Sequence, residues 1–93
     1  MDYNNKRNKK MAADRAYEFT AGGTRYRGTR LQIEQRLAGV APDRVRKYAV
    51  DIAGCRYPVT QVIHLGMGVP RPKCQSQQAY RALEALGFAI IEQ

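Results

Sequence analysis

The sequence predicts a small α+β domain in which two β-hairpins and a C-terminal strand pack with three helices. Three observations lead to this prediction. Two stretches alternate apolar and polar residues around a glycine turn, as hairpins do. Three segments carry apolar residues at helical spacing, and the chain ends in a short apolar run. Ninety-three residues are enough for one domain of modest core size.

The first 14 residues, MDYNNKRNKKMAAD, are rich in asparagine and lysine and show no apolar periodicity. Such a segment buries too little surface to offset the entropy lost on ordering. We therefore predict a basic mobile arm over residues 1–14 and the folded domain over residues 15–93. Basic arms can follow a phosphate backbone, and the arm's candidate contacts are Lys6, Arg7, Lys9 and Lys10.

The first hairpin is predicted from AYEFTAGGTRYRG, with a two-residue turn at residues 22–23. This turn pairs Phe19 with Tyr26 on one face of the ribbon. It pairs Glu18 with Arg27 on the other face. Both pairs are favourable across strands, so the register is well specified.

The second hairpin is predicted from KYAVDIAGCRYP, with its turn at residues 53–54. Val50 then pairs with Tyr57, and Ile52 pairs with Cys55 on the same apolar face. A cysteine in that position is expected to be a buried, unreactive thiol. A shift of 31 residues superposes the two hairpins with five identities in thirteen positions, from either an internal duplication or shared turn chemistry.

Each hairpin is followed by a predicted helix. Thr29 is the expected N-cap of the first, which presents Ile33 and Leu37 inward and ends near Gly39. Pro58 is expected at the first position of the second. Its predicted apolar stripe is Val59, Val62 and Ile63, and its predicted outer side is Thr60, Gln61 and His64.

A loop containing PRPKCQ precedes the third predicted helix. Ser76 is its expected N-cap and Gly87 its expected stop. Its inward face is expected to hold Ala79, Ala82, Leu83 and Leu86. The closing segment 88–91 is short and apolar, so we expect a strand beside the second hairpin.

The charge balance indicates the class of partner. Sixteen lysines and arginines against eight acidic residues give a formal net charge of +8. Such a field attracts polyanions, although a basic balance can also serve solubility alone. We therefore expect DNA as the partner, with RNA as an open alternative.

Arginine and glutamine side chains supply the candidate contacts to DNA. Gln can pair twice with adenine and Arg twice with guanine, so an exposed helix start with both residue types suits base recognition. Helix, loop and helix also resemble a helix-turn-helix, although with a longer connection. The predicted nucleic-acid-binding residues are Arg25, Arg27, Arg30, Arg56, Arg71, Lys73, Ser76, Gln77, Gln78 and Arg81.

Catalytic and metal sites are not predicted. The soft ligands Cys55, His64 and Cys74 lack the close pairs typical of zinc sites. The carboxylates are scattered, so no acid and base converge with a nucleophile. We expect neither an enzyme nor a cofactor, and we treat both cysteines as thiols. No apolar run is long enough to cross a membrane and no signal stretch follows the basic start, so we expect a cytoplasmic protein.

Residues 48–88 resemble the N-terminal head domain of McrA-like HNH endonucleases, type IV restriction enzymes that attack modified DNA. The resemblance rests on Tyr48, Gly54, Arg56, Tyr57, Pro58, Gly66 or Gly68, Leu86, Gly87 and Phe88. With a single histidine the chain has no HNH active site. The resemblance therefore implies a binding or accessory module near DNA processing.

The sequence thus favours a non-catalytic DNA-binding module, a small regulator or accessory of restriction or mobile-element DNA processing. The alternative is a protein interaction module: a nuclease inhibitor, a subunit, or a homo-oligomer such as a homodimer that pairs through an exposed hairpin edge.

Overall fold

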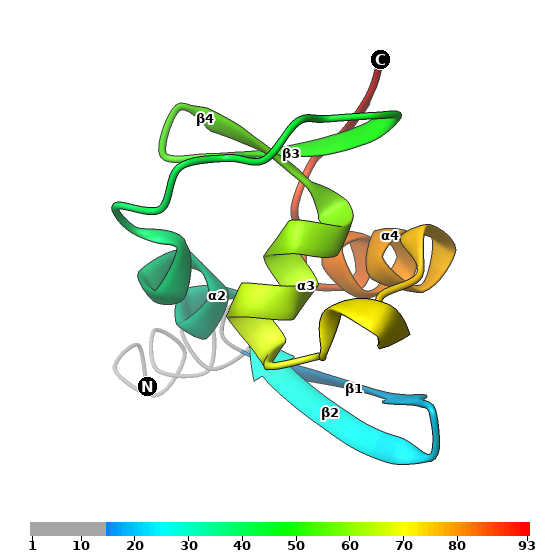
Figure 1. The fold of residues 1–93 in the computed structure, drawn as a ribbon. Helices are drawn as coiled ribbons and strands as arrows, with labels where there is room; N and C mark the ends of the chain where they lie inside the picture. Colours follow the sequence, from blue (N-terminus) through cyan, green and yellow to red (C-terminus); the bar gives the residue numbers. More distant parts are fainter. Residues whose placement is uncertain (1–14) are drawn as a thin grey trace, which may run out of the picture.

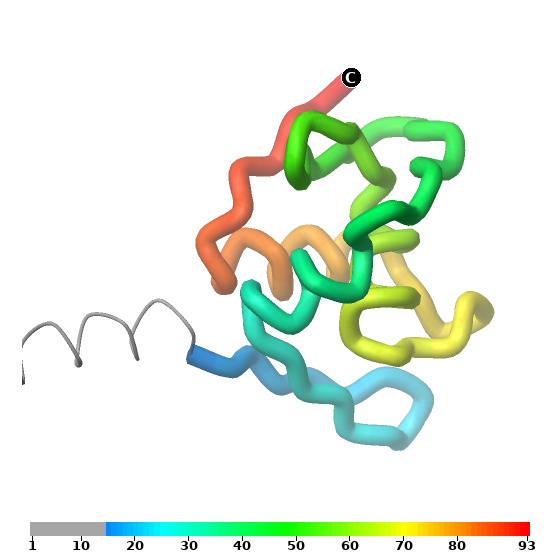
Figure 2. The backbone as a smooth tube through the Cα atoms, turned by 90° about the vertical axis from the view of Figure 1, so that its left-hand side faces the viewer, coloured from blue at the N-terminus to red at the C-terminus, as the bar shows by residue number. Residues whose placement is uncertain are grey.

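The computed structural model describes residues 15–93, which form two antiparallel sheets and three α-helices, as predicted for an α+β domain. The hairpins lie at opposite ends with the helices between them, and this arrangement is visible in two perpendicular views (Figures 1 and 2). In chain order the elements are β1 (Ala16–Ala21), β2 (Thr24–Thr29), α2 (Arg30–Leu37), β3 (Tyr48–Ile52), β4 (Cys55–Pro58), α3 (Val59–Met67), the 3-10 turn η1 (Arg71–Lys73), α4 (Ser76–Ala85) and β5 (Ile90–Glu92).

Both hairpins have the predicted register. Phe19 lies opposite Tyr26 in the first, and Val50 lies opposite Tyr57 in the second. The two turns share one conformation, with φ of 56° and 82° at residues 22–23 and 53° and 83° at residues 53–54. Left-handed values at both central positions match the right-handed twist of the strands, which is why glycine is favoured there. Ala53 adopts this conformation without being glycine.

The closing strand is also confirmed. β5 pairs antiparallel with β3, which gives the second sheet the strand order β4-β3-β5. The first sheet contains only β1 and β2. β4 and β5 are therefore the edges of the second sheet.

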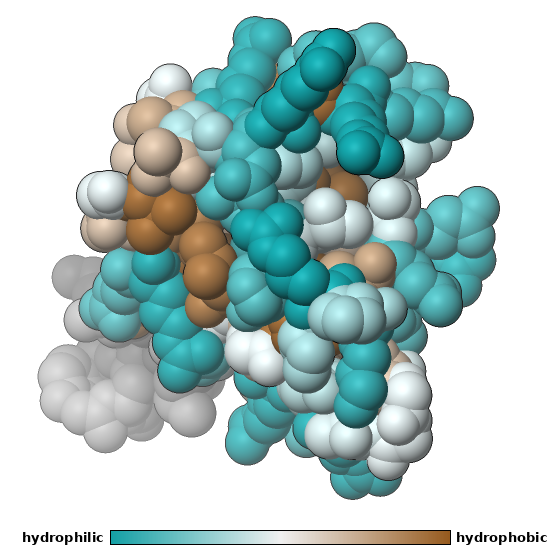
Figure 3. Space-filling model, viewed as in Figure 1, coloured by the Kyte–Doolittle hydropathy of each residue, from teal (hydrophilic) through white to brown (hydrophobic). Residues whose placement is uncertain are grey.

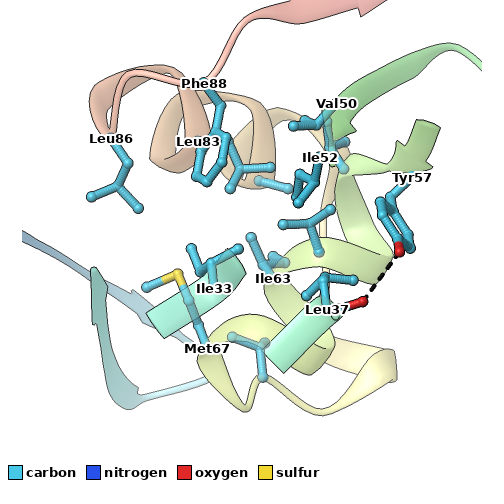
Figure 4. Close-up of a cluster of buried hydrophobic side chains, with 14 residues drawn as sticks. Ile33, Leu37, Val50, Ile52, Tyr57, Ile63, Met67, Leu83, Leu86 and Phe88 are labelled. Carbon is cyan, nitrogen blue, oxygen red and sulfur yellow. Dashed lines mark hydrogen bonds between the residues drawn. The ribbon is translucent and has the colours of Figure 1, made fainter. Parts of the chain in front are cut away.

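One apolar core joins the helices to the second sheet (Figure 4). α2 contributes Ile33 and Leu37, α3 contributes Ile63, and α4 contributes Leu83, all with 0% exposure. α2 and α3 approach closely because Gly66 has no side chain: a Cβ there would lie 2.8 Å from Cγ1 of Ile33.

The helix starts differ in part from the predictions. Thr29 caps α2 as expected, because its Oγ1 accepts a hydrogen bond from the Gln32 backbone N–H at 3.1 Å. Pro58 is the N-cap of α3 and ends β4, one position before the predicted place. Ser76 is not the cap of α4. It is the first helical residue, Gln75 is the N-cap, and no side chain bonds to the first turn.

Two burial predictions are wrong. Gln61 was expected on the outer side of its helix but is 2% exposed, because the segment after α2 crosses that face of α3. Cys55 was expected to be buried but is exposed. It lies at the tip of the second hairpin, directly after the turn at residues 53–54.

Tyr57 connects β4 to the end of α2. Its hydroxyl donates towards the carbonyl oxygens of Val40, at 2.7 Å, and Leu37, at 3.2 Å. Burial raises the pKa of the Tyr57 phenol above its usual 10.0, and nearby Cys55 adds to the rise. The folded state therefore resists ionisation of this group more than the unfolded chain does.

The consequence is a loss of stability at high pH. Below pH 10 the phenol is neutral in both states. Above pH 10 the phenol of the unfolded chain ionises first, and this lowers the free energy of the unfolded state relative to the folded one. We expect the stability advantage of the natural protein over Tyr57→Phe to be constant up to about pH 10 and to shrink above it, by up to about 1.4 kcal/mol per pH unit. Urea unfolding of both proteins from pH 8 to 11 measures this difference. A stability difference that stays constant from pH 8 to 11 would contradict a raised pKa of Tyr57 in the folded protein.

Candidate functional site

A hollow of about 760 Å³ opens where the second hairpin meets the starts of two helices. Its walls come from the segment that leads into β3, the end of β4, the first turn of α3, and the residues around η1 and α4. Hydrophilic side chains gather on the upper part of the face drawn in Figure 3. The lining residues are Asp43, Arg44, Arg46, Lys47, Tyr48, Pro58, Val59, Thr60, Arg71 and Ser76.

The hollow is strongly basic. Four cations line it, Arg44, Arg46, Lys47 and Arg71, against the single carboxylate of Asp43, which leaves three net positive charges. Arg71 Nη2 donates to Asp43 Oδ2 at 2.8 Å, but both side chains are about half exposed, so water weakens this pair. Within residues 15–93, no carboxylate lies within 4.0 Å of the other three cations.

Two helices begin at this hollow. Thr60 in the first turn of α3 and Ser76 at the start of α4 both line it. Neither helix has a side-chain cap, so their first backbone N–H groups keep their hydrogen-bonding capacity. Helix starts also carry partial positive charge. The dipoles and the cations therefore favour the same ligand, an anion.

Buried Gln61 fixes the segment that carries the cations. Its Oε1 accepts a hydrogen bond from the Asp43 N–H at 2.7 Å, and its Nε2 donates to the Ala41 carbonyl oxygen at 3.0 Å. Tyr57 holds the preceding residues through Val40. The segment is thus fastened to α3 and β4 just before the cations begin.

Four of the predicted contact residues lie at or beside this hollow. Arg71 and Ser76 line it directly. Gln77 and Arg81 lie beside it on α4, where they line an adjoining smaller hollow with Tyr48. The start of α4 therefore lies between two hollows with polar and charged linings.

The hairpin arginines are elsewhere. Arg25 and Arg27 extend from β2 at the opposite end of the molecule, and Glu18 lies 4.0 Å and 3.7 Å from them. Arg56 is exposed on β4, opposite Asp51 in the ladder. The two hairpins therefore do not present their arginines on one surface.

Three more predicted contacts are engaged within the fold. Arg30 donates to the Gly87 carbonyl oxygen at 2.9 Å and lies 4.6 Å from the Phe88 ring centroid. Gln78 Nε2 donates to the Thr20 carbonyl oxygen at 2.8 Å. The Lys73 side chain lies against the first turn, where a Cβ on Gly22 would be 2.8 Å from Lys73 Cε. These contacts fasten α2, α4 and η1 to neighbouring elements.

Arg44, Arg46 and Lys47 are the functional candidates that were not predicted. Their signal in the sequence was the basic run RVRK directly before the second hairpin. It falls in an irregular connection, where neither helical nor strand periodicity assigns a direction to a side chain. The predicted arm residues, Lys6, Arg7, Lys9 and Lys10, lie outside the described residues.

The single histidine and the two cysteines are spread over the fold. His64 Nδ1 lies 2.6 Å from the Val69 carbonyl oxygen and so joins the end of α3 to the next loop. Cys55 and Cys74 are free thiols. Burial raises the pKa of the Cys74 thiol, although Arg71 opposes the rise. Within residues 15–93, no three His, Cys, Asp or Glu side chains come together as metal ligands would.

Comparison with models of protein families found no match to this chain. Searches of curated proteins and of solved structures likewise found no significant match. Among the helices of residues 15–93, the longest, α4, has 10 residues, and none is long and apolar enough to cross a membrane.

Proposed function

We propose that this protein is a non-catalytic DNA-binding module and that the basic hollow binds the phosphate backbone. The observation that carries the proposal is the convergence of four cations and two uncapped helix starts on one concave surface. A phosphate there would meet charged side chains and backbone N–H groups together. The resemblance of residues 48–88 to a head domain of restriction enzymes suggests a regulator or accessory in DNA processing.

Binding of this kind gains free energy chiefly from counterion release. Each phosphate neutralised by Arg or Lys frees condensed cations into solution, and this release becomes less favourable as the salt concentration rises. Phosphate contacts also orient the protein on its ligand without reading sequence. Gln77 and Arg81, beside the hollow, are then placed to contact bases.

The salt dependence of binding tests the proposal. If each of the four cations neutralises one phosphate, log affinity should fall against log salt concentration with a slope of about −3 to −4. Fluorescence anisotropy with a labelled 16-nucleotide DNA, single-stranded and duplex, from 20 to 200 mM NaCl measures the slope. A flat dependence, or no binding of either form at low salt, would refute the proposal.

One observation favours the alternative, a protein partner. An apolar hollow of about 600 Å³ lies between α2 and the tip of the second hairpin, lined in part by Val40, Ile52 and Tyr57. An apolar patch appears there at the left of Figure 3, next to the edge strand β4. Edge strands beside apolar surface can pair with another chain. Light scattering with and without DNA tests the homodimer form of this alternative, because that form predicts a dimer without DNA.

A further inference from the structure

A second, smaller hollow of about 290 Å³ adjoins the basic hollow. Tyr48 lines both, so the two hollows lie next to each other. α4 supplies the rest of the smaller hollow through Gln77, Tyr80, Arg81 and Glu84. We call it the tyrosine slot. Its size is at the lower end of small-molecule sites, which run from about 300 to 1,000 Å³.

Two aromatic rings form the apolar part of the tyrosine slot. The centroids of Tyr48 and Tyr80 are 5.0 Å apart and their planes meet at 73°, an edge-to-face arrangement. Both residues are only half buried, so aromatic surface stays accessible. Lys47 Nζ lies 5.2 Å from the Tyr48 centroid, which brings a cation of the basic hollow directly against the aromatic pair.

The polar lining of the tyrosine slot can hydrogen-bond to the edge of a base. Gln77 offers a donor and an acceptor on one amide, Arg81 offers donors, and Glu84 offers acceptors. Gln77, Arg81 and Glu84 are all exposed and so are available to a ligand. Aromatic rings, amide and charged groups beside a cationic groove are the combination with which proteins bind unpaired nucleotides.

We propose that the DNA bound by this protein is single-stranded, with an unpaired base in the tyrosine slot and the adjoining phosphates in the basic hollow. This inference rests on the proposed function. It goes further because bases in a duplex are stacked and paired, so their faces cannot meet Tyr80 unless the nucleotide is first flipped out. Stacking accepts every base, so sequence preference should be weak and should come from the polar lining.

The decisive experiment needs no substitution. The natural protein is titrated with three labelled DNAs of equal length: a dT strand, the same strand with its central nucleotides abasic, and a duplex. The abasic strand keeps the backbone charge and loses the bases. We expect it to bind about 5- to 150-fold more weakly than the dT strand, the range for loss of one stacked base. We also expect the dT strand to bind more tightly than the duplex.

A matched pair of variants assigns the effect to the slot. Tyr80→Phe keeps the ring, so its affinity for the dT strand should stay within about twofold of the natural value. Tyr80→Leu keeps apolar volume but has no π face. The ratio of its affinities for the dT strand and the abasic strand should therefore be smaller than that of the natural protein by about 5-fold or more. Thermal unfolding of both variants checks that the fold is retained.

The outcomes separate the two proposals. Equal affinity for dT and abasic strands, with the steep salt slope intact, would overturn the tyrosine slot and leave the phosphate site standing. Tighter binding of the duplex than of the dT strand would also overturn it. Absence of binding to all three DNAs at 20 mM salt would refute the phosphate site and this inference with it.

Discussion

Replacing Arg44 and Arg46 together by alanine is expected to lower the affinity for single-stranded or duplex DNA roughly 25- to 60-fold at 0.1 M salt. Both side chains line the basic hollow, and no carboxylate within residues 15–93 lies within 4.0 Å of either. Each lost phosphate contact removes about 0.7 to 0.9 from the slope of log affinity against log salt. The slope should therefore become less steep by about 1.4 to 1.8.

The matched control is Arg25→Ala with Arg27→Ala. It removes the same charge from the first hairpin, where neither side chain lines the hollow and Glu18 lies within 4.0 Å of both. Long-range attraction is largely screened at 0.1 M salt, so we expect less than about threefold loss and an unchanged slope. Equal losses in the two double variants would mean that only net charge matters, and the hollow would not be the binding site.

Replacing Gln61 by methionine is expected to lower the free energy of unfolding by about 1 to 3 kcal/mol. Methionine keeps the buried volume but can neither accept from the Asp43 N–H nor donate to the Ala41 carbonyl oxygen. The segment that carries the cations then loses its fastening to α3. We expect DNA affinity to fall about fivefold from this lost preorganisation, while the salt slope stays unchanged because every cation remains.

Gln35→Met is the control for this substitution. Gln35 is exposed on α2, so the same change there should alter stability by no more than about 0.5 kcal/mol. Urea unfolding and DNA titration of both variants give the comparison. If Gln61→Met unfolds like the natural protein and binds DNA equally well, the segment must be held by other contacts.

Local pattern was sufficient for much of the fold. The pairing of Phe19 with Tyr26 and of Val50 with Tyr57 followed from period-two alternation and the turn glycines. The Thr29 cap, the stop at Gly87 and the inward face of α4 followed from neighbouring residues in the same way. These features depend on interactions within a few positions along the chain or across one short turn.

The candidate site was predictable only in part. Arg71 and the start of α4 were expected from residue type, and the structure places them at the basic hollow. Arg25 and Arg27 have the same residue type, yet they are on the first hairpin at the other end of the molecule. Residue type identifies a group that can bind phosphate, but it does not place that group beside another one.

The sequence alone determined the hairpin registers, the inward faces of α2 and α4 and the basic charge, because adjacent residues and composition decide them. Tertiary structure decided where the charge is concentrated. The irregular segment with Arg44 and Arg46 crosses α3, buries Gln61 and comes to lie over the starts of two helices. Contacts between residues far apart in the chain fix that path, and no periodicity in the segment itself encodes it.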